Sequence, residues 1–85
     1  MSHSDQQTEA ESQLVEYIAQ NLVNDPDKVR LRTKHIGNTT ILELRVARND
    51  MGRVIGKQGR VANAIRSLLK VVANQKDQRI VLEID

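Results

Sequence analysis

The sequence contains no cysteine, a single proline and a single aromatic residue, Tyr17. Without cysteine the chain can form neither a disulfide nor a thiolate metal site. Its only histidines, His3 and His35, stand apart in a polar segment and near a turn, where a lone histidine is usually a solvated side chain. We therefore expect no metal and no cofactor. One aromatic side chain is also too few for the base-stacking platforms of RRM and OB-fold proteins.

The chain also lacks a long apolar segment. No stretch approaches the roughly 20 apolar residues that a membrane-spanning helix needs. Residues 1–12 are polar and acidic, without the basic start and apolar run of a secretory signal. These features predict a cytoplasmic protein with no membrane association. Because no Ser–His–acid set, pair of buried carboxylates or metal cluster is evident, we also expect no enzymatic activity.

Charge is distributed unevenly along the 85 residues, although the formal net charge is only +2. Residues 1–27 carry six acidic side chains and no lysine or arginine, whereas residues 51–76 carry six basic side chains and no acidic one. A basic segment concentrated around one loop suits a polyanionic ligand. A solvated helix face would have the same composition, so charge alone does not decide between the two.

The pattern of apolar residues predicts how the first part of the chain folds. Residues 1–12 have no periodic apolar positions, and we expect them to be a disordered acidic tail. From there Leu14, Ile18 and Leu22 recur every four residues, which is typical of one face of a helix. The segment 24–27 contains the proline and ends this helix.

Strands and two further helices follow. Alternating apolar and polar residues predict strands at 29–34, 41–47 and 79–84, the first two joined as a hairpin by a turn at Gly37 and Asn38. A short helix at 51–55, with Asn49 and Asp50 as candidate N-caps, precedes a longer helix at 60–73. The inner face of the longer helix is predicted to carry Val61, Ile65, Leu68 and Val72.

The predicted order is helix, strand, strand, helix, helix, strand. We expect an α+β domain over residues 13–85, in which helices cover one face of a three-stranded sheet. The chain is long enough for this one small domain and no more.

The most informative segment is the glycine loop between the last two helices. Gly56 and Gly59 are separated by Lys57 and Gln58, and glycine permits a sharp turn and a close approach by another backbone. The helix that follows directs free N–H groups and the positive end of its dipole towards the loop, which suits phosphate. The spacing matches neither a P-loop nor a dinucleotide fingerprint. A plain interhelical turn is the alternative.

The run Ile55-Gly56-Lys57-Gln58-Gly59, followed by aliphatic Val61 and Ile65, resembles the signature of KH domains. The order of elements resembles the type II arrangement. Residues 42–47 and 50–60 resemble the KhpA family of small stand-alone bacterial KH proteins. This resemblance implies that the G-x-x-G loop clamps about four nucleotides of single-stranded RNA by their backbone.

The resemblance also assigns roles to individual residues. The phosphates would be held by Gly56, Lys57, Gln58 and Gly59. RNA would be steered by the charges of Arg53 and Arg60. The floor of the groove that receives the bases would be lined by Val54, Ile55, Val61 and Ala62. For the aliphatic residues the alternative is core packing alone.

Partners follow from the same resemblance. KhpA-like proteins are proposed RNA chaperones that form homodimers or heteromers with a KhpB-type KH–R3H protein and act in cell shape and cell-wall synthesis. The helix at 60–73 carries apolar residues on more than one face, such as Ala64 and Val71. This favours pairing with a second protein chain, although a small domain could bury these residues itself. We expect weak, salt-sensitive RNA binding by one copy. The alternative function is a protein–protein interaction module with a KH fold and little RNA binding.

Overall fold

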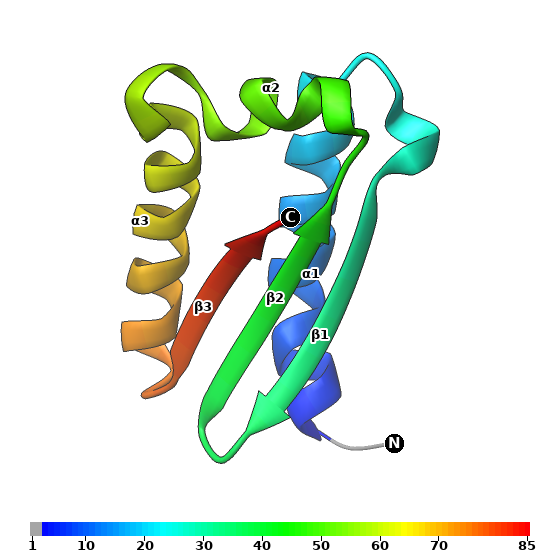
Figure 1. The fold of residues 1–85 in the computed structure, drawn as a ribbon. Helices are drawn as coiled ribbons and strands as arrows, with labels where there is room; N and C mark the ends of the chain where they lie inside the picture. The colour runs from blue at the N-terminus through cyan, green and yellow to red at the C-terminus, as the bar shows by residue number, and fades with distance from the viewer. Residues whose placement is uncertain (1–2) are drawn as a thin grey trace.

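The computed structural model describes the backbone of residues 3–85 and the side chains from residue 10 onward (Figure 1). The helices are α1 (His3–Leu22), α2 (Met51–Ile55) and α3 (Arg60–Gln75), and the strands are β1 (Arg30–Ile36), β2 (Thr39–Arg45) and β3 (Arg79–Ile84). Three single-turn 3-10 helices lie at 26–28, 48–50 and 57–59. The predicted order of helices and strands is confirmed, and the bounds of α2 and β3 are those expected.

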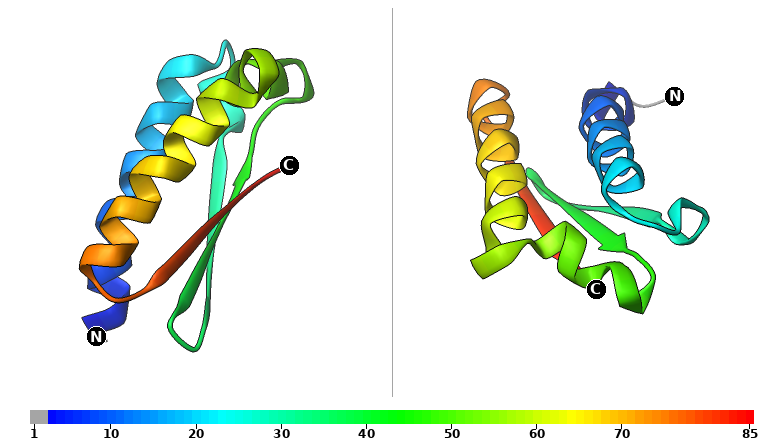
Figure 2. Two further views of the ribbon diagram at one scale, coloured as in Figure 1. Left: turned by 90° about the vertical axis from the view of Figure 1, so that its left-hand side faces the viewer. Right: turned by 90° about the horizontal axis from the view of Figure 1, so that it is seen from above.

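The three strands form one sheet in the order β1-β2-β3. The β1–β2 hairpin is antiparallel, and Ile36 pairs with Thr39 across its turn. β3 runs parallel to β2, which requires a crossover connection, and α2 and α3 supply it. Both long helices, α1 and α3, lie on the same face of the sheet (Figure 2). The predicted α+β architecture, with helices on one face only, is therefore confirmed.

The hydrophobic core lies between the central strand and the two long helices. On β2, Leu42 and Leu44 are completely buried, and the predicted alternation with outward-facing residues is confirmed. The other buried apolar residues of the core come from the three α-helices, from β3 and from the two segments that flank the β1–β2 hairpin: Val15, Ala19, Val29, Val46, Val54, Ile65, Leu69 and Leu82. β1 lies at the edge of the sheet, and within it only Leu31 is even half-buried.

The structure continues α1 back to His3, through most of the segment that the sequence predicts to be a disordered tail. The tail itself stays a prediction. Residues 1 and 2 lie outside the described part of the chain. Apolar periodicity marks only the face of a helix that packs on a core, so it cannot locate a polar extension. Glu11 lies in this extension, is buried, and pairs with Lys76 through Oε1 and Nζ at 2.6 Å. That contact ties the extension to the end of α3.

The inner face of α3 also differs from the prediction. Ile65 is buried as expected, but Leu68 is 55% exposed, and Ala62, Leu69 and Ala73 are buried instead. The helix is rotated so that two alanines face the sheet, where small side chains permit close packing. The larger apolar residues Leu68 and Val71 are consequently left on the surface.

Candidate nucleic-acid interface

The glycine loop joins α2 to α3 at one end of the molecule, the upper end in Figure 1. Three of its four residues have positive φ angles: Gly56 at 79°, Gln58 at 58° and Gly59 at 75°. Residues with a side chain adopt such angles rarely. The chain therefore turns sharply here, and the tip formed by Lys57 and Gln58 projects with both side chains exposed.

Gly56 cannot be replaced without displacing its neighbours. A Cβ atom on this residue would lie 2.5 Å from Cγ2 and 2.8 Å from the backbone nitrogen of Val61. At Gly59 the nearest atom, Nδ2 of Asn63, would be 3.7 Å away. The first glycine is thus required by close packing of the loop on α3, whereas the second is required by its backbone angle alone.

The loop satisfies part of its own backbone. The Gly56 N–H donates to the Gly52 carbonyl at 2.8 Å, and the Gly59 N–H donates to the Gly56 carbonyl at 3.1 Å. The Arg60 N–H donates to the Lys57 carbonyl. Two of the N–H groups at the start of α3, which the sequence predicts to face the loop unbonded, are therefore used by a 3-10 turn. The amides of the tip residues, Lys57 and Gln58, are not among these bonded groups.

The charges around the loop are not equivalent. Arg53 Nε lies 3.2 Å from Oδ1 of the buried Asp50, so part of its charge is already neutralised. Arg60 is exposed, and its Nη2 donates to Gln58 Oε1 at 3.3 Å. Within the described part of the chain, neither Lys57 nor Arg60 forms an ion pair. The positive charge offered to a ligand is therefore concentrated on these two residues.

The aliphatic residues assigned to a groove floor divide into two groups. Val54 is completely buried and Ala62 nearly so, because both pack inward beneath the loop. They present almost no surface to a ligand, which favours the alternative of core packing, and their contact with RNA stays a prediction. Ile55 and Val61 retain exposed surface, and of the four they alone can contact a ligand.

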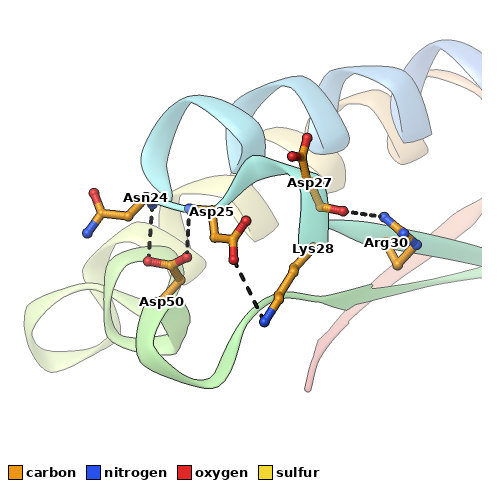
Figure 3. A network of polar contacts seen from close by, with 6 residues as sticks. All are labelled: Asn24, Asp25, Asp27, Lys28, Arg30 and Asp50. Atoms are coloured by element: carbon orange, nitrogen blue, oxygen red, sulfur yellow. Dashed lines mark hydrogen bonds and ion pairs between the residues drawn. The ribbon is translucent and has the colours of Figure 1, made fainter.

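Asp50 is a residue whose role the sequence did not reveal. It precedes α2, but its side chain makes no N-cap hydrogen bond, so the predicted capping role is wrong. Instead Oδ1 accepts the Asn24 N–H and Oδ2 accepts the Asp25 N–H, both at 3.1 Å (Figure 3). The carboxylate also accepts from Arg53. These contacts hold the chain between α1 and β1 against the start of α2, and thereby fix the base of the glycine loop.

The same contacts predict how stability depends on pH. The Asn24 N–H, and then the Asp25 N–H and Arg53, hold the pKa of Asp50 below its ordinary value of 3.8. A carboxyl whose pKa is lowered on folding stabilises the fold above its unfolded pKa, and this stabilisation is lost as the pH falls through the folded pKa. The contribution of Asp50 is therefore complete near neutral pH, begins to decline as the pH approaches 3.8, and is lost as the pH falls through the lower pKa of the folded state.

We expect Asp50→Asn to lower the Tm at neutral pH by roughly 5 °C or more, because an amide cannot accept all three hydrogen bonds. The difference from wild type should shrink as the pH falls below 3.8. Thermal unfolding followed by circular dichroism between pH 7 and pH 3 measures both effects. Asp27→Asn, at an exposed position nearby, is the matched control. Parallel Tm curves for wild type and Asp50→Asn would contradict this role.

Residues 12–84 match the family model described as "KhpA/KhpB, KH domain", which spans most of the chain. The protein belongs to the KhpA/KhpB KH-domain family. The order of elements is the type II arrangement that the sequence resemblance implied.

Members of the family from several bacteria are similar to this chain. The RNA-binding protein KhpA of Caldanaerobacter subterraneus is 49% identical over 72 residues, which cover 85% of this chain and 96% of that protein. KhpA of Clostridium acetobutylicum is 50% identical over 72 residues, which again cover 85% of this chain and 96% of that protein. KhpA of Borreliella burgdorferi is 45% identical over 74 residues, which cover 87% of this chain and 90% of that protein.

Among solved structures, the fold is similar to part of Era from Aquifex aeolicus, crystallised with GDP.AlF4-. The TM-score is 0.54 at 20% identity, and the match covers 88% of this chain and 29% of the Era chain. At this identity the likeness concerns the fold alone. Within residues 3–85 of the KhpA-family chain, no helix has the length and apolarity needed to cross a membrane.

Proposed function

We propose that this KhpA-family protein binds single-stranded RNA in the cytoplasm, as an RNA chaperone or post-transcriptional regulator, and grips the RNA backbone at the G-x-x-G loop. The observation that carries the proposal is the exposed tip of Lys57 and Gln58, which two glycines hold in a fixed conformation. The tip offers an unpaired cation and two amides to a phosphate. The KhpA proteins to which the chain is similar are named as RNA-binding proteins, which supports the same conclusion.

Binding by one copy should be weak because few charges take part. Lys57 and Arg60 are the unpaired cations nearest the loop, and each phosphate contact with a single strand contributes about −0.7 to the slope of log K against log salt. Two or three contacts give a slope of about −1.4 to −2. Single-stranded RNA should be preferred, because a KH loop clamps the backbone of an unpaired strand.

Fluorescence anisotropy with a short labelled RNA tests this proposal. The wild-type protein should bind the single strand more tightly than a duplex of the same sequence, and its affinity should fall between low and physiological salt with the slope given above. No binding to the single strand at low salt, or equal binding to strand and duplex, would overturn it.

A homodimer is the second part of the proposal. Ala64, Leu68 and Val71 are spaced i, i+4 and i+7 and so lie along one face of α3, and all three are exposed. Leu68 and Val71 leave 55% and 56% of their surface accessible, which is unusual for large apolar residues that recur on one helix. We propose that this stripe pairs with the same stripe of a second copy. Two linked loops would bind one RNA through their raised effective concentration.

We expect Leu68→Glu to convert the dimer into a monomer, because pairing would bury the new charges without partners. Circular dichroism should be unchanged, since the side chain is exposed in the single chain. Light scattering at several protein concentrations measures the mass. Gln20→Glu, which adds the same charge at an exposed position of α1, is the control. A wild-type protein that is monomeric throughout, or a Leu68→Glu protein that remains dimeric, would disprove the pairing.

The exposed stripe also favours a second candidate function, a protein–protein interaction module with little RNA binding. The family resemblance supports a KhpB-type KH–R3H protein as the partner and a role in cell shape and cell-wall synthesis. Copurification of a KhpB-type protein with the wild type but not with Leu68→Glu would support this partner. If such a partner bound while single-stranded RNA did not, the second candidate would replace the first.

A further inference from the structure

A second basic surface extends along α3 away from the loop. Gly59, Asn63, Arg66 and Lys70 are spaced i, i+4, i+7 and i+11, which places them along one face of the helix. The closeness of Asn63 Nδ2 to Gly59 shows that this face begins at the loop itself. With a rise of 1.5 Å per residue, the face runs about 16 Å from Gly59 to Lys70, a length that a few nucleotides can cover.

This face leads into a groove of about 460 Å³ between α3 and β3. β3 is an edge strand, so its outer backbone edge faces the groove. All the ionisable side chains that line the groove are basic, namely Arg66, Lys70 and Arg79. Half-buried Ile80 and Val81 supply apolar surface, whereas Ala73 and Leu82, which also line the groove, are buried and add almost none. The groove therefore combines cations for a phosphodiester backbone with apolar walls for the flat face of a base.

Arg66 is held in a fixed orientation at this groove. Its Nε and Nη2 both donate to the Leu82 carbonyl, at 3.3 and 3.2 Å. A guanidinium has five N–H donors in one plane, so Nη1 and the remaining N–H of Nη2 are available to a ligand. The same bonds occupy the Leu82 carbonyl, which an edge strand would otherwise offer as an acceptor. At this point the groove offers hydrogen-bond donors and not acceptors.

We propose that Arg66 reads one base in this groove and gives the protein a preference for guanine over adenine. Guanine places two acceptors, O6 and N7, side by side, and a guanidinium can donate to both. Adenine carries an amino group beside its N7, which would oppose the donors of Arg66. The inference rests on the proposed RNA binding and adds to it a residue that determines base preference.

The test uses the full chain and single-stranded oligouridine with one central guanine, adenine or 7-deazaguanine. Wild type should bind the guanine strand more tightly than the adenine strand by about 5- to 150-fold, the range for a good bidentate base contact. The 7-deazaguanine strand, which lacks the N7 acceptor, should lose most of this preference. Because each result is a ratio measured on one protein preparation, a partly unfolded variant does not change it.

Arg66→Lys keeps the charge but not the planar pair of donors, so its guanine-to-adenine ratio should fall below that of wild type while the salt dependence persists. Arg66→Met has no donor, so its ratio should approach one. Arg32→Lys, on β1 and away from the groove, should retain the wild-type ratio. Equal binding of the two strands by wild type, or an undiminished ratio in Arg66→Lys, would overturn the role of Arg66 and leave RNA binding intact. Failure of wild type to bind any of the strands would overturn both proposals.

Discussion

Replacing Gly56 by alanine should destabilise the domain by about 3 kcal/mol or more, whereas Gly59→Ala should cost only about 1–2 kcal/mol. Gly56 has φ of 79° and ψ of 170°, a region that is essentially restricted to glycine. Its new Cβ would also lie 2.8 Å from the backbone nitrogen of Val61, which cannot move without shifting α3. Gly59, at φ of 75° and ψ of 13°, has the left-handed helical conformation and free space for a methyl group.

The loss of stability expected for Gly56→Ala is large for so small a domain. At roughly 0.05–0.15 kcal/mol per residue, a chain of this length has a total stability of about 4–13 kcal/mol. Urea unfolding measures the difference, since stability follows from the midpoint and the slope of the transition. Gly52→Ala is the control, because Gly52 lies in α2 with nothing within 4 Å of the new Cβ, and alanine favours a helix by about 1 kcal/mol. Equal midpoints for Gly56→Ala and Gly59→Ala would show that the loop does not pack on Val61 as described.

The sequence was sufficient to predict those features that depend on local chemistry. The glycine spacing located the loop between 55 and 60, and alternation located the buried face of β2 and the bounds of β3. Each of these signals arises within a few residues of the chain. The family resemblance was carried by residues 50–60, which include the loop, together with residues 42–47.

Features that depend on tertiary contacts could not be predicted. Asp50 receives its two amide hydrogen bonds from residues 25 and 26 positions away, so no local pattern distinguishes it from an ordinary N-cap. The apolar residues of α3 cover more than one face, and only packing against the sheet decides that Leu69 is buried and Leu68 exposed. The 3-10 turn that uses the Gly59 and Arg60 amides is likewise visible only in the folded loop.

Substitutions at the tip of the loop should have a large effect on RNA affinity. We expect Lys57→Asp combined with Gln58→Asp to weaken single-stranded RNA binding by roughly 10- to 150-fold or more, the equivalent of one lost charge-assisted hydrogen bond, with repulsion added. Both side chains are exposed, so the change removes no core contact. Aspartate also tolerates the positive φ of position 58 better than most residues. The fold should therefore remain intact.

A control with the same change in net charge separates the loop from general electrostatics. Arg32→Asp combined with Asn38→Asp also makes the protein more negative by three charges, and it alters exposed positions on the β1–β2 hairpin. If long-range charge alone governed binding, this variant and the loop variant would lose similar affinity. If the loop grips the backbone, the hairpin variant should lose far less.

The most direct measurement is the affinity of wild type, the loop variant and the hairpin variant for one labelled single-stranded RNA, at low and at physiological salt, with circular dichroism to verify folding. We expect salt-sensitive binding by wild type and a modest loss of affinity in the hairpin variant. The folded loop variant should lose at least tenfold in affinity and show a shallower salt dependence. A folded loop variant that bound RNA as tightly as wild type would contradict the claim that Lys57 and Gln58, held between Gly56 and Gly59, are the site of backbone recognition.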